Sequence, residues 1–277
     1  MPELPEVETI ARNLRLGHQG APALPGQTIT GVTLHWPRHV AEPTPQAFRR
    51  RIHLQTFQSV LRRGKYLVLP LSRGCLLIHL KMSGDLEVAR GGSPPGRFDR
   101  TVLHLQSGWE LRFSDARKFG KLFLVDDPSA RLGALGPDPL DDGFTPGLLH
   151  RRLASHRRAL KPLLMDQGFV SGLGNIYTDV ALHVARLHPL LPSHHVGTEG
   201  AIRLWSGIRE TLQEGLRRNG SSIDWVYRGG EYQNHFRVYQ RSGEACIACG
   251  TAIERIVVAQ RGTHFCPRCQ PAPRGVG

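Results

Sequence analysis

The sequence has 277 residues, of which 40% are hydrophobic, enough for one large or two medium-sized domains with a buried core. It contains no run of about 18 apolar residues and no apolar N-terminal signal segment, which excludes a membrane-spanning helix and predicts a cytoplasmic, nucleoid-associated protein. The formal net charge of +13 is shared by residues 1–140 (19 basic, 12 acidic) and 141–277 (17 basic, 11 acidic), so it does not come from a basic tail. A charge spread over the whole molecule indicates a polyanionic partner that both halves bind, and nucleic acid is the first candidate.

The chain opens with Met1-Pro2-Glu3-Leu4-Pro5-Glu6. If Met1 is removed, Pro2 presents a secondary amine that can attack an electrophilic carbon and form a Schiff base. Glu3 and Glu6 would then lie close enough to move protons. The alternative is an ordinary helix start, with a proline in the first turn and acids that suit the helix dipole.

The first predicted helix has its apolar residues at the spacing i, i+3, i+4, i+7, and Gly17 follows as a stop. Short apolar or alternating runs from about Thr28 to Asp126 then predict strands that form a β-sandwich or barrel. The helix stripe is Val7, Ile10, Ala11 and Leu14, and the strand runs are 29–36, 59–71, 75–80, 86–88, 101–106, 110–114 and 121–125.

A stretch rich in Gly, Pro and Asp, residues 133–147, predicts a domain boundary at 136–140. Helical periodicity follows, with Thr145-Pro146 as a helix start, a second helix from Asn175 to about Arg186 and a third from Thr198 to Arg218. We expect the third helix to bury one apolar face, made of Ile202, Trp205, Ile208, Leu212 and Leu216. Short helices joined by glycine-bearing turns are typical of DNA-binding modules. Residues 219–240 are predicted to form a long loop.

Two C-x-x-C pairs near the C-terminus are separated by 16 residues. Four thiolates at this spacing are typical of a tetrahedral structural zinc site, whereas two disulfides are not expected in a reducing compartment. The predicted ligands are Cys246, Cys249, Cys266 and Cys269. Arg261-Gly262 lies near the turn between the two strands of this hairpin, where an arginine can reach a phosphate. The fifth cysteine, Cys75, follows an apolar pattern and is expected to be a buried thiol.

Two turns of the β region have an apolar side chain at the tip. Met82 lies in the turn of residues 79–84 and Phe119 in that of residues 115–120, next to Arg117. Such residues are usually core, but in a basic protein they can act as wedges between bases, because an enzyme that acts on a base must first extrude it. No phosphate-binding loop or dinucleotide fingerprint is present, so no nucleotide or organic cofactor is indicated.

Together these motifs resemble the bacterial formamidopyrimidine-DNA glycosylases, also called 8-oxoguanine-DNA glycosylases, over essentially the whole chain. The matching segments are 1–9, 63–67, 79–84, 117–120, 166–167 with 172–177, and 260–270. The resemblance implies an α+β multidomain fold with an N-terminal helix and antiparallel β-sandwich (1–136), a helix-two-turns-helix domain (137–240) and a C-terminal zinc-finger β-hairpin (241–277). DNA would lie in the cleft between them.

The resemblance also implies a function: removal of oxidised purines from double-stranded DNA by a monomeric glycosylase and abasic-site lyase with one structural zinc ion. Pro2 would be the nucleophile at the sugar C1′ and Glu3 the acid and base, with support from Glu6. Lys65 and Arg261 would assist elimination. The residues implied to contact DNA are His79, Met82, Arg117, Phe119, Arg157, Lys161 and Asn175.

Two residues depart from the family pattern: Phe98 stands where relatives often have a DNA-contacting histidine, and Val180 where a glutamate is common. Two other functions stay open. One is an endonuclease VIII-like glycosylase for oxidised pyrimidines, which Leu4 disfavours because that branch typically has glycine there. The other is a non-catalytic zinc-finger DNA-binding protein, which would not account for Pro2-Glu3.

Overall fold

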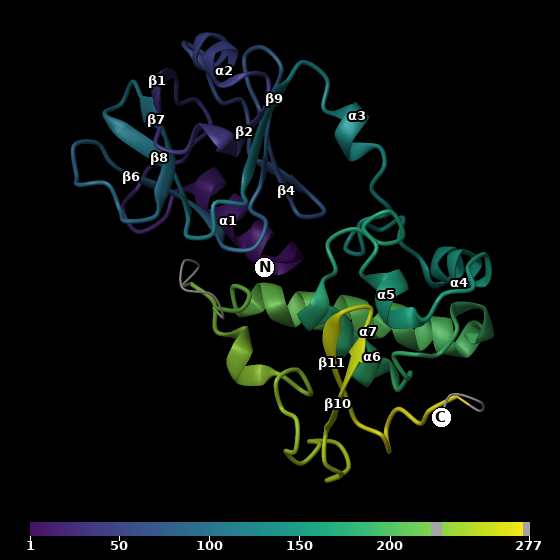
Figure 1. The fold of residues 1–277 in the computed structure, drawn as a ribbon. Helices are drawn as coiled ribbons and strands as arrows, with labels where there is room; N and C mark the ends of the chain where they lie inside the picture. Colours follow the sequence, from purple (N-terminus) through teal and green to yellow (C-terminus); the bar gives the residue numbers. More distant parts are fainter. Residues whose placement is uncertain (223–228, 274–277) are drawn as a thin grey trace. The chain divides into compact units, whose positions relative to one another are not determined.

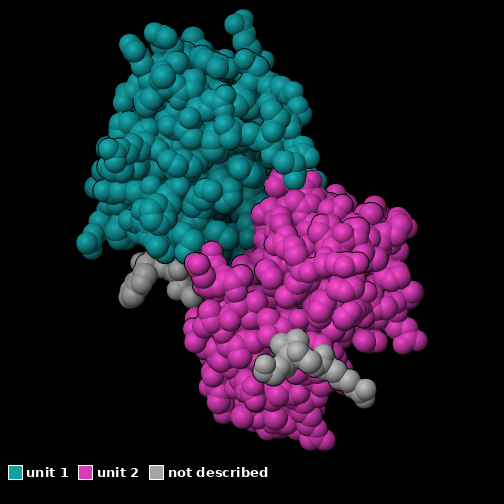
Figure 2. Space-filling model, turned by 45° about the vertical axis from the view of Figure 1, so that its right-hand side comes forward, with its two compact units in different colours: residues 1–134, 219–230 teal, residues 135–218, 231–277 magenta. Residues whose placement is uncertain are grey.

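The computed structural model describes residues 1–222 and 229–273, which form two compact units (Figures 1 and 2). Unit 1 comprises residues 1–134 and 219–230, and unit 2 comprises residues 135–218 and 231–277. The chain therefore changes unit close to the predicted boundary at 136, and the zinc hairpin belongs to the same unit as the helices. The predicted loop at 219–240 is divided between the units, and residues 223–228 of it lie outside the described residues.

Unit 1 is a β-sandwich with one long helix, α1 (Leu4–Leu16), packed against it. Its four-stranded sheet has the order β1-β7-β8-β6, and all its strand pairs are antiparallel. The strands are β1 (Ile29–Leu34), β6 (Gly84–Arg90), β7 (Asp99–Leu105) and β8 (Trp109–Asp115). A single core contains residues of α1 and of both sheets, so the predicted helix and sandwich are confirmed.

The second sheet has the order β2-β9-β5-β4-β3 and is buried on both faces. Side chains alternate along a strand, so Leu67 and Leu69 enter the sandwich core while Val68 lies in a smaller cluster on the opposite face. The strands are β2 (Val40–Glu42), β3 (Leu61–Arg63), β4 (Tyr66–Pro70), β5 (Cys75–His79) and β9 (Lys121–Val125). Because both faces of this sheet are buried, the sequences of its strands are continuously apolar rather than alternating. Cys75 is buried as expected, and its burial raises the pKa of the thiol to about 11.

One strand pair of the β-sandwich is parallel, because the short strand β2 pairs with β9 in that direction. It is preceded by the 3-10 helix η1 (Pro37–His39) and followed by α2 (Pro45–Ile52), which the sequence analysis did not predict. The start of α2 is encoded locally: the Thr44 hydroxyl accepts a hydrogen bond from the Ala47 N–H (3.3 Å), and Pro45 occupies the first turn.

Unit 2 contains the predicted helices and the hairpin. α4 begins at Pro146, where the Thr145 hydroxyl accepts a hydrogen bond from the Leu148 N–H (3.2 Å). The helices are α4 (Pro146–Ala154), α5 (Leu160–Leu164), α6 (Asn175–Ala185) and α7 (Thr198–Arg217), with the short α3 (Ser129–Leu132) at the end of unit 1. The two 3-10 turns are η2 (Ser193–His195) and η3 (Tyr232–His235), and the hairpin consists of β10 (Glu254–Val258) and β11 (Arg261–Phe265).

The predicted apolar face of α7 is partly wrong, because Ile202 is 47% exposed. The buried stripe includes Leu204, Ile208 and Leu212 and is widened by glycine. A Cβ at Gly207 would lie 2.9 Å from the Ala181 carbonyl oxygen of α6, so the two helices pack more closely than any side chain would permit. An apolar periodicity does not reveal that kind of contact. No helix of the described ranges is long and apolar enough to cross a membrane.

We predict that Gly84→Ala destabilises unit 1 by about 1–3 kcal/mol, because an added methyl group cannot be accommodated. The Cβ would lie 2.6 Å from the Leu80 carbonyl oxygen and 2.8 Å from Cε2 of Phe113. The measurement is the urea midpoint of unfolding. Gly31→Ala is the control, since its Cβ would lie at an ordinary 3.7 Å from Cδ2 of His104. Equal midpoints for the two variants would contradict the prediction.

Candidate functional site

The N-terminal residues singled out in the sequence begin α1 and are buried. Glu3 is the N-cap of the helix, and the side chain of Glu6 accepts a hydrogen bond from the Glu3 N–H at 2.8 Å. The Glu3 carboxylate accepts a hydrogen bond from the backbone of the third helical residue, which completes a capping box. Pro2 is buried, and both carboxylates are 2% exposed. The helix-start interpretation therefore holds, and the same geometry presents an acid directly beside the chain terminus.

Glu6 also binds a segment 215 residues further along the chain. Its second oxygen accepts hydrogen bonds from the Ser221 N–H (2.7 Å) and the Ser221 hydroxyl (3.2 Å). Gly220, with a φ of +78°, allows this approach, because a Cβ there would lie 2.6 Å from Glu6 Oε1. With both oxygens engaged, Glu6 is suited to hold the helix start in place. Ser221 was missed because nothing in a polar, glycine-containing stretch indicates a partner in α1.

Lys65 and His79 lie at the same end of the five-stranded sheet. Lys65 is in the turn between β3 and β4 and is buried, and His79 is the last residue of β5. Burial, followed by the charges of Lys81 and Lys65, lowers the pKa of His79 to about 3. Its neutral ring accepts a hydrogen bond from the Lys81 N–H at Nδ1 (3.0 Å) and meets the Tyr66 ring edge-on at 4.8 Å. His79 thus acts as an uncharged anchor for the turn that bears Met82.

The two predicted wedge turns differ in how far their apolar tips are exposed. Phe119 is 50% exposed, and the guanidinium of Arg117 lies 5.1 Å from the centre of its ring. Met82 is half-buried, between Lys81 with a φ of +55° and the buried Ser83. An exposed phenylalanine beside an arginine is a suitable surface for stacking and for hydrogen bonding to a base.

In unit 2, Asn175 begins α6 and Arg157 is exposed between α4 and α5. Lys161 in α5 is buried, with its ammonium group bound to the Asp179 carboxylate and to the Asn175 carbonyl oxygen (3.2 Å). Its predicted phosphate contact therefore requires the ammonium group to leave this ion pair. Asp179 was missed in the sequence because it lies within an otherwise apolar helical pattern.

One face of α6 binds the hairpin through side chains spaced four residues apart. The Asn175 amide donates to the Gly262 carbonyl oxygen (3.1 Å), and the Asp179 carboxylate accepts from the His264 N–H (2.9 Å). Nε2 of His183 lies 3.3 Å from Sγ of Cys246. Val180, a departure from the family pattern, is buried in the core of this unit. The hairpin is therefore fixed to the helix that carries Asn175, and Arg261 extends into solvent at the start of β11.

The four predicted metal ligands come together. The sulfur atoms of Cys246, Cys249, Cys266 and Cys269 all lie within 4.8 Å of one another. The Cys246–Cys269 and Cys249–Cys266 sulfur pairs are 3.9 and 3.5 Å apart. Four thiolates about 2.3 Å from a tetrahedral zinc ion are about 3.8 Å apart, so the donors match zinc in number and spacing. Such a site has no open position, and its role is structural.

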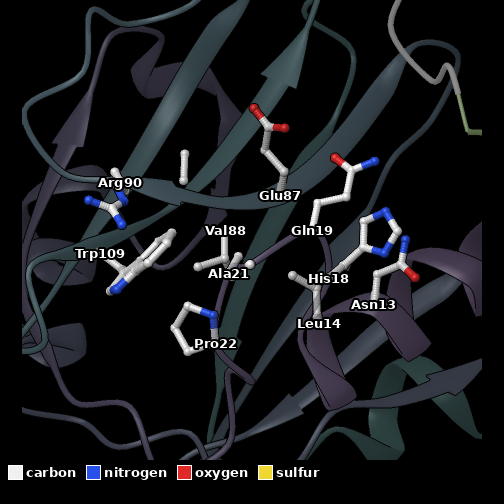
Figure 3. A pocket seen from close by; sticks show the side chains of 12 residues that line it. Asn13, Leu14, His18, Gln19, Ala21, Pro22, Glu87, Val88, Arg90 and Trp109 are labelled. Atoms are coloured by element: carbon white, nitrogen blue, oxygen red, sulfur yellow. The ribbon is translucent and has the colours of Figure 1, made fainter.

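Unit 1 contains a pocket of about 370 Å³ (Figure 3). It is formed at the C-terminal end of α1, with Trp109 and Arg90 on one side and His18 and Asn13 on the other. None of the predicted site residues is among the described residues that line it. Pro2 and Glu3 lie at the opposite end of the same helix, so this cavity is distinct from the candidate reaction site.

We predict that Cys266→Ser abolishes stoichiometric zinc binding, because a closed four-thiolate site loses one of its ligands. Metal analysis of the purified protein measures the zinc content. Cys75→Ser is the matched control: this cysteine lies in unit 1, outside the sulfur cluster, and its variant is expected to retain one zinc ion per chain. Unchanged zinc content in Cys266→Ser would contradict the assignment.

Three family models match the chain in order. They are described as the formamidopyrimidine-DNA glycosylase N-terminal domain (residues 1–122), the formamidopyrimidine-DNA glycosylase H2TH domain (135–226) and a zinc finger found in FPG and IleRS (243–272). Curated relatives named formamidopyrimidine-DNA glycosylase include one from Chloroflexus aurantiacus, 45% identical over 98% of both chains. Another, from Symbiobacterium thermophilum, is 41% identical over 100% of this chain and 91% of its own.

Solved structures give the same result. The Lactococcus lactis FPG (MutM) in complex with Fapy-dG-containing DNA is 33% identical with a TM-score of 0.89, and the match covers 98% of this chain and 100% of that one. A MutM in complex with carbocyclic 8-oxo-G-containing DNA is 34% identical with a TM-score of 0.90 at the same coverage. A further Lactococcus lactis complex contains an abasic site and has a TM-score of 0.89.

Proposed function

The chain belongs to the formamidopyrimidine-DNA glycosylase family, and from this premise we propose that it excises oxidised purines from double-stranded DNA and then cleaves the strand. The observation that supports this most directly is the acid Glu3, buried as the N-cap of α1 beside Pro2. Family relatives that are bound to DNA with Fapy-dG, 8-oxo-G or an abasic site support the substrate class.

In the proposed reaction the nitrogen of Pro2 attacks C1′ of the damaged nucleotide and displaces the base. Glu3 protonates the sugar ring oxygen as the ring opens, which leaves an iminium ion between Pro2 and C1′. The iminium ion makes the C2′ proton acidic, so its removal expels the 3′ phosphate, and a second elimination expels the 5′ phosphate. Lys65 and Arg261 are proposed to assist these eliminations, and Glu6 to hold Glu3 in place.

Met1 must be removed before this chemistry can begin. With Met1 attached, the nitrogen of Pro2 is an amide without a basic lone pair. The structure includes Met1, so it shows the chain before this processing step.

We further propose that Met82, Arg117 and Phe119 fill the space left by the extruded nucleotide, with His79 fixing the first of these turns. The exposed, paired positions of Arg117 and Phe119 support this role. Phosphate contacts are proposed for Lys65, Arg157, Lys161, Asn175 and Arg261. The protein would act as a monomer on the DNA of the cytoplasmic nucleoid, through three domains at 1–136, 137–240 and 241–277.

The first test is borohydride trapping on duplex DNA with one 8-oxoguanine. Protein without Met1, verified by mass spectrometry, is expected to give a covalent adduct that maps to Pro2, whereas protein with Met1 gives none. Glu3→Gln is expected to lower excision roughly 100-fold or more, since a general acid and base contributes about 10²–10⁴-fold. Glu8→Gln, on the same helix and paired with Arg62 (2.8 Å), is the control and should stay within a few-fold of the unchanged chain.

The absence of an adduct with properly processed protein would refute the mechanism. Full excision by both Pro2→Gly and Glu3→Gln would do so as well. Duplex binding without any excision by the properly processed, unchanged chain would favour a non-catalytic DNA-binding protein. Faster excision of thymine glycol than of 8-oxoguanine would instead identify the endonuclease VIII-like function.

The second test concerns phosphate contacts through the salt dependence of duplex binding. Arg261→Gln is expected to reduce the slope of log K against log salt by about one, because each phosphate contact releases about one counterion. Lys161→Met should reduce it equally if its ammonium group leaves Asp179 to bind a phosphate. An unchanged slope for Lys161→Met would contradict that contact, and an unchanged slope for Arg261→Gln would contradict the role of the hairpin.

A further inference from the structure

The buried carboxylate of Asp115 connects the two turns that carry the proposed void-filling residues. Asp115 is the last residue of β8 and has no solvent exposure. One of its oxygens accepts hydrogen bonds from the Ser83 hydroxyl (2.6 Å) and the Arg117 N–H (3.2 Å). The other accepts the Gly120 N–H (2.7 Å) and lies 3.3 Å from Nε2 of His39. Each oxygen of one side chain therefore holds a different part of the proposed wedge.

The first oxygen joins the Met82 turn to the Arg117 turn directly. The Ser83 hydroxyl donates to Asp115 and accepts the Arg117 N–H at 3.0 Å, so the three groups form a closed triangle. Ser83 immediately follows Met82, and Gly84 closes the same turn through a hydrogen bond from its N–H to the Leu80 carbonyl oxygen (3.0 Å). A shift of Asp115 would therefore move the Met82 and Arg117 backbones together.

The second oxygen fixes the far end of the Arg117–Phe119 turn. Lys118, at the middle of this turn, has a φ of +62°, a conformation that costs energy for a residue with a side chain and needs support from its surroundings. Gly120 provides that support only because it lacks a Cβ, which would lie 2.4 Å from Cζ of Phe113 and 3.1 Å from Asp115. The turn is thus stabilised by backbone N–H groups at both of its ends that donate to the Asp115 carboxylate.

The Asp115 carboxylate is in turn held in place by His39. The ring of His39 is buried and packs against Phe113 in a tilted arrangement, with the ring centres 4.5 Å apart. Its Nδ1 lies 3.4 Å from the Thr101 hydroxyl. Burial by itself would raise the pKa of Asp115, but hydrogen bonds from His39, Ser83 and the Gly120 N–H outweigh it and lower the pKa to about 2. The carboxylate is therefore ionised at any pH at which DNA is handled.

From this geometry we infer that Asp115 is a positioning residue for base extrusion: it keeps Met82, Arg117 and Phe119 in one fixed arrangement, so that the duplex meets them as a single rigid wedge. The inference depends on the proposed void-filling role of these three side chains. Asp115 touches no substrate atom, and it acts through the backbone of the two turns.

The test separates extrusion from chemistry by using two substrates. Excision of 8-oxoguanine from a duplex requires the base to leave the stack, whereas cleavage of a single-stranded abasic oligonucleotide does not. Asp115→Asn is expected to lower the first rate roughly tenfold or more and to leave the second within about twofold, because an amide cannot accept from all four donors at once. A 2-aminopurine beside the lesion should also report slower unstacking.

Two further variants keep the test decisive. Ser83→Ala removes only the connection between the turns and is expected to lower duplex excision a few-fold in the same direction, with no further loss when combined with Asp115→Asn. Asp127→Asn changes an exposed acid that accepts hydrogen bonds from the nearby Ser129. This variant is the matched control and should be unchanged. If Asp115→Asn does not fold, the result for Ser83→Ala decides the question.

Wild-type duplex excision by Asp115→Asn or by Ser83→Ala would overturn the inference, and so would an equal loss of both activities in folded Asp115→Asn. Met82→Ala and Phe119→Ala show which proposal has failed. If these two variants excise normally while Asp115→Asn does not, Asp115 does not act by positioning Met82 and Phe119, even though the enzyme is active. If the unchanged protein releases no base, the proposed function fails first.

Discussion

The structure depends on how buried carboxylates are satisfied in an arginine-rich chain. An ionised acid out of water costs several kcal/mol unless hydrogen bonds compensate it, and backbone N–H groups are its most rigidly placed donors. Glu6, Asp115 and Asp179 each accept at least one such N–H, from Ser221, Gly120 and His264 respectively. Each acid therefore fixes the position of the turn, loop or strand that carries the donor.

This arrangement explains how exposed side chains that are proposed to contact DNA can lie on a short turn or at the start of a strand and still be precisely placed. Arg117, Phe119 and Arg261 point into solvent, and their own side chains do little to fix their backbone. The backbone of these segments is instead held by buried carboxylates that accept hydrogen bonds from it. Loops ordered in this way lose little conformational freedom when they meet a ligand, which favours both affinity and correct orientation.

Much of the architecture could be predicted from the sequence because it follows from local patterns. The helix stripe ending at Gly17, the Thr145-Pro146 start and the paired cysteines each encode their structure within a few residues. The anchoring acids could not be found in this way. Asp115 precedes a basic turn, which is visible in the sequence, but its partners Ser83 and His39 are 32 and 76 residues away. The burial of Lys161 is likewise decided by Asp179, a residue one helix further along the chain.

The bond between Glu6 and Ser221 has a consequence for the synthesis of the protein. Ribosomes make α1 first, but the donors that satisfy Glu6 lie 215 residues later, after most of unit 2 has been translated. Until then the Glu6 carboxylate must stay hydrated, so the start of α1 cannot bury fully and the acid at its N-cap remains mobile. A nascent or prematurely terminated chain would therefore display its N-terminus without the final geometry of the proposed site. The long sequence separation delays completion of that site until helices α4 to α7 have also been made.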